Sequence, residues 1–402
     1  MPSALEDRDI QALLKLLAWE LFGKESDIDA DSVDWQHVLA EADRQVLTAL
    51  LYPGLKRLPG APEEMVAAAR SAAIASTMQW EHILPVLTEI VQKLEEVNIP
   101  CAVLKGASVA RLYPHPELRV PGDIDLLVNE CDMAEASETL AEIGFTVNHS
   151  TEMHDCFSRM GVTVELHRAA SVFPDTEKGR FAEAYMAGAL QSAQKRTFQG
   201  CQIPVLTGAH QSISLLAHME RHMSKSGIGL RQIVDWAVAI QAAEEVQDEQ
   251  FIPALEHCGL LRYAQVVTRG CEMNLGLPQR EWTQEVPDEL ADAVMVDVFA
   301  AGNFNDRVGE HSVGAVMMND KTAGDSAGVH ILRNYCRYVR KRVQASYPWA
   351  KSPLWVPIFC IYFAAQRYVR VLMGKRKKVR LRDAIKTARD RQGLIQKLKL
   401  YQ

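Results

Sequence analysis

The sequence predicts an α+β fold, in which a small unit of strands and helices lies between two helical regions. Residues 97–170 alternate short apolar runs with amphipathic segments, a pattern typical of strands mixed with helices. Residues 1–95, and the chain after about residue 175, carry apolar residues at helical spacing instead. The chain has 402 residues, of which 48% are hydrophobic and 24% charged, so a disordered or collagen-like chain is excluded.

These patterns divide the chain into five segments. A helical region at 1–95 precedes the mixed core at 96–206, and a helical domain follows at 207–302. Glycines among polar residues predict a loop or linker at 303–330. A basic, aromatic-rich helical segment is predicted at 331–402.

The N-terminal region begins with leucines at helical spacing, at positions 13, 14, 16, 17 and 21. Asp29 or Asp31 is suited to cap the next helix. Pro62-Glu63-Glu64 resembles the first turn of a long helix that reaches Glu96 and contains Pro85. This region predicts a scaffold, since it holds no catalytic constellation.

The elements of the core and of the following domain are read from their period and their turn residues. Strands are predicted at 99–104, 123–128, 145–147, 162–166 and 203–206. Helices are predicted at 107–113, 132–143, 178–190, 208–224, 229–244, 250–258, 260–276 and 285–300.

Asp123 and Asp125 are the most informative residues. They open a strand directly after a Pro-Gly turn, and residues i and i+2 of a strand point to the same face. Two carboxylates so close repel each other, and burying them unpaired is costly. A divalent cation such as Mg²⁺ removes this cost, because it takes carboxylate oxygens together with substrate phosphates.

Further residues fit the same chemistry. Glu165 lies in an alternating strand that could neighbour the Asp pair. Lys105-Gly106-Ala107-Ser108 is a strand-to-helix junction, where backbone N–H groups, the serine hydroxyl and the lysine can meet phosphate charge. The order of glycine turn, helix, paired aspartates and later acid predicts a phosphoryl-transfer site with one or two metal ions.

This order of motifs resembles the nucleotidyltransferase superfamily with the polymerase-beta-like fold. LKGASVARLYPHPELRVPGDIDLLV followed by VTVELHR more closely resembles a bacterial family of uncharacterised nucleotidyltransferases. The matching residues are Lys105, Gly106, Tyr113, Pro114, Arg119, Asp123, Asp125, Glu165 and His167. The resemblance is specific over about 97–170 and departs from the superfamily at Ala107, which replaces a serine, although Ser108 follows.

The resemblance implies a small mixed sheet and a Mg²⁺-dependent transfer of a nucleotide, with Mn²⁺ as an alternative ion. ATP or another NTP would give up its NMP to a hydroxyl-bearing acceptor and release pyrophosphate. Asp123, Asp125 and Glu165 would hold the metal, unless Glu165 acts as the base. Gly106 and Ser108 would seat the triphosphate, while Lys105 and Arg119 would stabilise charge on the transferring group.

Four more residues are candidates for the substrate cleft. His218 and His222 lie at i and i+4 of a predicted helix, a ligand spacing that lacks a third zinc ligand. Since the resemblance extends weakly over 210–238, these histidines and Asp235 are expected to line the acceptor cleft. His167 follows Glu165 on the same strand face and is expected to orient substrate or to form a local hydrogen bond.

The charge of the chain is uneven. The net charge of −7 hides 19 basic and two acidic residues at 331–402, against 25 basic and 49 acidic residues before them. Three interpretations of the basic segment stay open: a helix packed on the acidic body, contact with a membrane surface, and binding of RNA such as tRNA.

The sequence also bears on compartment. The start, MPSALEDRDI, is unlike a secretory signal peptide, and the apolar run at 355–365 is too short to span a membrane. The eight cysteines include no CxxC pair. We expect a cytoplasmic enzyme, peripheral to the membrane in one alternative. A degenerate scaffold that binds a membrane or partner through the basic segment is the alternative function.

Overall fold

The computed structural model describes residues 4–25, 27–225, 227–242, 249–301, 352–372 and 390–402, together with 336, 337, 339, 340, 343, 347 and 350. The linker predicted at 303–330 and the basic cluster at 375–382 lie outside the described residues.

A seven-stranded mixed sheet forms the centre of the core, with the order β3-β4-β5-β2-β1-β7-β6. Its strands are β1 (Cys101–Val103), β2 (Ile124–Val128), β3 (Thr146–Ser150), β4 (His154–Arg159), β5 (Val162–His167), β6 (Gln194–Phe198) and β7 (Cys201–Val205). The central strand β2 is parallel to β5 and antiparallel to β1. The described fold confirms the predicted α+β class.

Strand alternation gives the sheet two different faces. Ile124, Leu126 and Val128 of β2 are buried in one apolar cluster, while Leu127 belongs to the large cluster of the helical regions. Because side chains alternate along a strand, Asp125 shares the face of Leu127. One face of β2 therefore packs in an apolar cluster, and the other carries Asp125 toward the helical domain.

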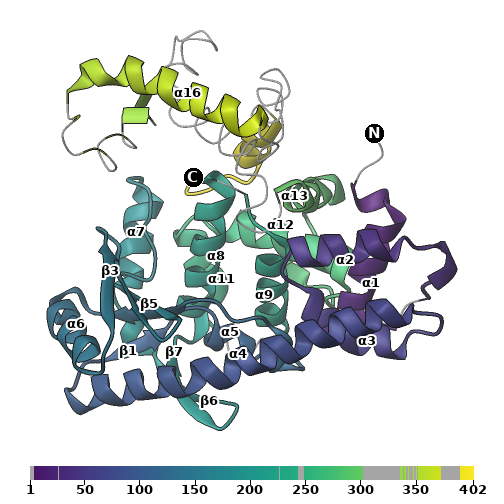
Figure 1. Ribbon diagram of the computed structural model, residues 1–402, viewed down its shortest axis with the longest axis horizontal. Coiled ribbons are helices and arrows are strands. Elements are labelled where there is room, and N and C mark those ends of the chain that lie inside the picture. Colours follow the sequence, from purple (N-terminus) through teal and green to yellow (C-terminus); the bar gives the residue numbers. More distant parts are fainter. Residues whose placement is uncertain are drawn as a thin grey trace.

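Helix α4 (Glu63–Glu96) joins the N-terminal region to the core. Its first half buries Met65 and Ala69 among the N-terminal helices. Its second half buries Trp80, Leu87 and others against the apolar face of the sheet, beside α6 (Met133–Glu142). Figure 1 shows this helix running below both regions. Pro85 lies inside the helix without ending it.

The remaining N-terminal helices are α1 (Arg8–Phe22), α2 (Trp35–Arg44) and α3 (Tyr52–Arg57). Asp34, rather than Asp29 or Asp31, caps α2, and its side chain accepts from the amides of Gln36 and His37. Asp29 instead precedes a short 3-10 turn.

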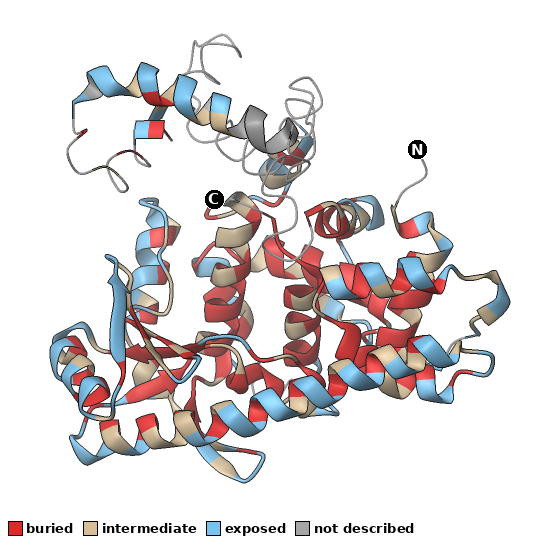
Figure 2. Ribbon diagram, viewed as in Figure 1, coloured by how far each residue is buried: buried red, intermediate tan, exposed pale blue. Residues whose placement is uncertain are grey.

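The core also contains α5 (Ala107–Ala110) and α7 (Glu177–Met186). The helical domain that follows contains α8 (Gly208–Lys225), α9 (Leu230–Gln241), α11 (Phe251–His257), α12 (Leu261–Leu275) and α13 (Asp288–Ala301). Figure 2 shows α8 and α9 largely buried in the middle of the molecule. Both helices therefore have little surface that faces bulk solvent.

Helix α16 (Val356–Leu372) is set apart at the top of Figure 1. Phe359 is buried against Val339, Val343 and Ala350. Among the described helices, none is both long and apolar enough to cross a bilayer.

Candidate active site

Strands β2 and β5 bring two of the predicted acids together. In the parallel pairing of these strands, Asp125 is the direct partner of Glu165, and Leu127 is the partner of His167. Side chains of partnered residues lie on one face of the sheet. Glu165 and His167 therefore share the acid-bearing face with Asp125, as the sequence predicts.

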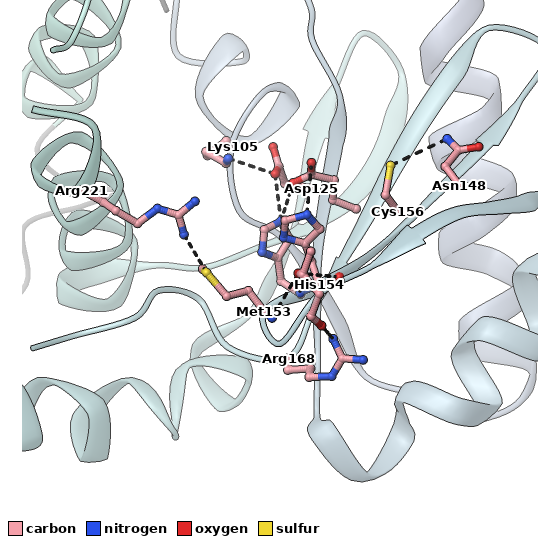
Figure 3. Close-up of polar contacts among 11 residues, drawn as sticks. Lys105, Asp125, Asn148, Met153, His154, Cys156, Arg168 and Arg221 are labelled. Atoms are coloured by element: carbon pink, nitrogen blue, oxygen red, sulfur yellow. Dashed lines mark hydrogen bonds and ion pairs between the residues drawn. The ribbon is translucent and has the colours of Figure 1, made fainter. Parts of the chain in front are cut away.

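The carboxylate of Asp125 is the centre of a charged network. Its Oδ1 accepts a contact from Lys105 Nζ at 2.9 Å and one from His167 Nε2 at 3.0 Å. Figure 3 shows Lys105 and Asp125 pointing toward each other. Burial disfavours the charged carboxylate, but Lys105 and the hydrogen bond from His167 outweigh burial and hold the pKa of Asp125 well below its ordinary value.

A second contact joins His167 to the third acid. Its Nε2 lies 3.2 Å from Glu165 Oε2, and His154 Nε2 lies 3.6 Å from Glu165 Oε1. The hydrogen bond from His167 lowers the pKa of Glu165, against burial and the charge of Asp125. Burial lowers the pKa of His167, yet its hydrogen bonds to Asp125 and Glu165 outweigh burial, so its pKa is raised.

Asp123 lies at the mouth of the site with an exposed side chain. Partial burial, followed by the charges of Asp125 and Glu165, raises its pKa. Lys105 and Arg231 act in the opposite direction without cancelling the effect. The charges of Asp125 and Glu165 thus add to burial in disfavouring the ionised form of Asp123.

Helices α8 and α9 face the acids across a cavity of about 420 Å³. Nearly all the predicted site residues line it: Lys105, Gly106, Arg119, Asp123, Asp125, Glu165, His167, His218, His222 and Asp235. The wall of α8 also contributes Ser214 and Arg221, and α9 contributes Arg231. These helical residues recur every three or four positions, so one face of each helix is turned to the cavity.

The two predicted histidines of α8 are neighbours. The rings of His218 and His222 are 4.5 Å apart, edge to face. Burial, with smaller contributions from Lys105 and His222, lowers the pKa of His218 well below its ordinary value. Its imidazole is therefore neutral at pH 7. It can donate a hydrogen bond to a molecule bound in the cavity, or accept one from it.

Arg119 and Asp235 form a buried ion pair at the floor of the cavity. Arg119 donates from Nε and Nη2 to the two carboxylate oxygens, both at 2.8 Å. The Tyr113 hydroxyl donates to the same carboxylate at 2.6 Å, and Trp80 donates to the Arg119 carbonyl at 2.8 Å. The positive charge of Arg119 is therefore paired with the carboxylate of Asp235 and does not face a ligand in the cavity alone.

The glycine turn is placed as predicted, and the serine is not. Gly106 adopts φ +62°, a conformation favoured for glycine, and lines the cavity. Ser108 is only 1% exposed, and its hydroxyl accepts from Gln211 at 3.5 Å. It lies beneath the turn instead of among the residues that line the cavity.

The donor atoms fit a divalent cation. Among the described residues, ligand atoms of His154, Glu165 and His167 all lie within 4.8 Å of one another, and Asp125 adjoins them through His167. Carboxylate oxygens suit Mg²⁺, and imidazole suits transition metals. A cation beside Asp123 would relieve the repulsion from Asp125 and Glu165 that contributes to its raised pKa.

Sequence reasoning missed His154 and Arg231. His154 is the cross-strand partner of His167, while the adjacent Asp155 pairs with Arg168 at 2.9 Å on the other face; Figure 3 shows both His154 and Arg168. Only the register of β4 could reveal this position. Arg231 occurs one turn before Asp235, and that helical spacing was an available signal.

Comparison with known proteins agrees with this geometry. The chain matches the family described as uncharacterised nucleotidyltransferase over residues 31–276. Comparison with curated proteins gives no match, and comparison with solved structures gives none. The match covers more than half of the chain and includes the paired acids, the glycine turn and helices α8 and α9. The protein therefore belongs to the family of uncharacterised nucleotidyltransferases.

Proposed function

We propose that this protein transfers AMP from ATP to a hydroxyl-bearing acceptor, with release of pyrophosphate, in a reaction that depends on Mg²⁺. The observation that carries the proposal is the register of Asp125 against Glu165, at a cavity that Asp123 and Lys105 also line. The cavity volume of about 420 Å³ lies in the range of small-molecule sites.

Asp123, Asp125 and Glu165 are the residues that would hold the metal. The ion, when bound, would neutralise phosphate charge and favour the departure of pyrophosphate. Mn²⁺ is an alternative, because His154 and His167 adjoin the carboxylates and imidazole suits transition metals.

The acceptor hydroxyl would attack the α-phosphorus, and the bond to the bridging oxygen of pyrophosphate would break. If Asp123 and Asp125 alone hold the metal, Glu165 is the base that accepts the proton of the hydroxyl, because its lowered pKa keeps it ionised. Lys105 lies within the site to stabilise charge on the phosphoryl group. Gly106 allows the backbone to approach the phosphates closely. His218, which is neutral, would orient the acceptor.

The first experiment measures pyrophosphate release with each of the four common NTPs, with Mg²⁺ and with a chelator. Metabolite, protein and tRNA fractions are supplied in turn as acceptor, since these three classes stay open. We expect release with ATP, Mg²⁺ and one fraction, and a mass increase of one AMP on the product. Absence of release under every combination would contradict the proposal, and release without any divalent cation would contradict its metal dependence.

We also propose that the C-terminal segment contacts an anionic membrane surface. On and before α16, Leu354, Ile358 and Ile361 are 83%, 56% and 72% exposed, and Tyr362 is 47% exposed. Their spacing puts them on one face of the helix. The sequence at 375–382 that follows contains six basic residues and no acid. An exposed apolar face followed by basic residues favours an interfacial helix over RNA binding.

This second proposal is tested by sedimentation with vesicles of phosphatidylcholine, with and without phosphatidylserine. We expect binding only to the anionic vesicles, and its loss in an Ile358→Ser, Ile361→Ser variant. Ile74→Ser, at an exposed isoleucine on α4 (51% exposed), is the matched control and should bind like the wild type. Binding of tRNA without binding of vesicles would favour the RNA alternative and contradict this proposal.

A further inference from the structure

On the helical wall of the cavity, Arg231 is a cation whose charge acts on Asp123. The second position of α9 (Leu230–Gln241) holds it, and its Nη2 lies 3.7 Å from where a Cβ on Gly122 would stand. Gly122 directly precedes Asp123. The guanidinium therefore lies against the turn that begins β2, beside the carboxylates proposed to hold the metal.

Arg231 has no anion of its own in the described part of the chain. Neither a hydrogen bond nor an ion pair is found for it there. Asp235, one turn later on α9, is the nearest candidate on its own helix, but both of its oxygens accept from Arg119, and Tyr113 adds a third donor. Arg221, across the wall on α8, contacts the sulfur of Met153 at 3.2 Å instead.

The position of Arg231 is unfavourable for a cation without an anionic ligand. It occupies the first turn of α9, where the helix dipole disfavours positive charge. Burial, and then the neighbouring charge of Arg119, lowers its pKa to about 10, so it remains charged at neutral pH. Two amides at the start of α9 are already satisfied, since Leu230 N donates to Gln45 and N–H of the N-cap Gly229 donates to Gln232. An anion bound at this point would therefore be held by the side chain of Arg231.

We propose that Arg231 binds the triphosphate of the nucleotide and supplies positive charge there in place of Arg119, which the resemblance implies would stabilise charge on the transferring group. This inference rests on the proposed function, because it places the phosphates beside Asp123. A guanidinium presents two parallel N–H donors that match phosphate oxygens. Asp235 has the complementary part: by pairing with Arg119 it leaves Arg231 as the cation available to the ligand.

The test measures binding of ATP, AMP and inorganic tripolyphosphate by calorimetry to wild type, Arg231→Gln, Arg231→Lys and Arg221→Gln. Circular dichroism first establishes that each variant is folded. We expect Arg231→Gln to weaken ATP and tripolyphosphate binding by about 10–100-fold, in line with the loss of a charged hydrogen-bond pair, and to change AMP binding less than threefold. Arg231→Lys should recover part of the loss, and Arg221→Gln, which removes another cation of the cavity wall, should weaken ATP binding less than Arg231→Gln does.

The outcomes separate this inference from the proposed function. ATP binding that is retained in Arg231→Gln contradicts the role of Arg231 and leaves the proposed function standing. If Arg231→Gln weakens the binding of AMP and ATP equally, Arg231 acts on the nucleoside or on folding, and the inference is overturned. If Arg221→Gln weakens ATP binding as much as Arg231→Gln does, the effect is one of general positive charge, and the inference is again overturned. Failure of the wild type to bind any of the three ligands contradicts both.

Discussion

Removal of the Asp235 carboxylate should destabilise the protein more than removal of its partner. Asp235→Ala leaves Arg119, which is 3% exposed, without either of its two 2.8 Å acceptors. It also removes the acceptor of the Tyr113 hydroxyl. Arg119 and Arg231 would then face each other without the carboxylate whose charge acts on both. Removal of one member of a buried ion pair leaves the other charge buried and unpaired, and lowers the free energy of unfolding by about 3–5 kcal/mol.

Removal of Arg119 should lower the free energy of unfolding less than removal of Asp235 does. In Arg119→Met, the Asp235 carboxylate keeps the hydrogen bond of Tyr113 and the charge of Arg231. An Arg119→Met, Asp235→Leu double variant removes both charges together and should recover much of the loss, since apolar residues can replace a buried pair. Asp175→Ala is the matched control, because Asp175 pairs with Arg180 at 2.6 Å but is 91% exposed; it should cost less than about 1 kcal/mol.

Urea unfolding followed by tryptophan fluorescence measures these differences. Trp80 donates to the Arg119 carbonyl and so reports on this part of the molecule. Unfolding of a chain of this size need not be two-state, so midpoints are compared at fixed conditions with a second probe, far-ultraviolet circular dichroism. If Asp235→Ala shifts the midpoint no more than Asp175→Ala, the reasoning about the buried pair is refuted. If the Arg119→Met, Asp235→Leu double variant lowers the midpoint as much as Asp235→Ala does, the unpaired charge is not the cause of the loss of stability.

Three further predictions concern titration and capping. Burial, opposed by His115 and Arg57, raises the pKa of Glu20 from 4.5 to about 7. The folded state therefore binds this proton more tightly than the unfolded state does. The free energy of unfolding should fall by about 3 kcal/mol as pH rises from about 4.5 to 7. Glu20→Gln should remove this slope in unfolding measured across the same range. The pKa of His167 is raised, so its contribution to stability is complete below pH 6.5 and is lost as pH rises through the raised pKa. NMR titration of His167 without metal should show a lower pKa in Asp125→Asn than in the wild type. Asp7 caps α1 by accepting from two amides, so Asp7→Ala should cost about 1 kcal/mol in thermal unfolding, and no loss would contradict the cap.

The sequence predicted the parts of the fold that carry apolar alternation. Strand β2 has five buried residues, and its apolar run was visible beside the aspartates. Strand β4, which lies between β3 and β5, was not predicted. The edge strands β3 and β6 were predicted only in part or not at all. Each has a neighbour on one side only, and their residues are mostly exposed, so polar side chains occupy both faces and leave no pattern.

The candidate site was predictable where spacing along one element decides it. Asp123 and Asp125 share a strand face, and His218 and His222 share a helix face, because the periods of strand and helix are fixed. The use of Arg119 could not be predicted, since its partner Asp235 lies 116 residues away. Ser108 illustrates the same limit: its position beneath the turn depends on Gln211 of α8, a contact that local sequence does not contain.

Transfer of label from α-³²P ATP tests the central claim most directly. Wild-type protein, Asp125→Asn and the surface control Asp175→Asn are each incubated with Mg²⁺ and the acceptor fraction, after circular dichroism has shown that they are folded. The account predicts label on the acceptor and free pyrophosphate with the wild type and the control, and loss of both by at least about 100-fold in Asp125→Asn. Full Mg²⁺-dependent transfer by folded Asp125→Asn would contradict it.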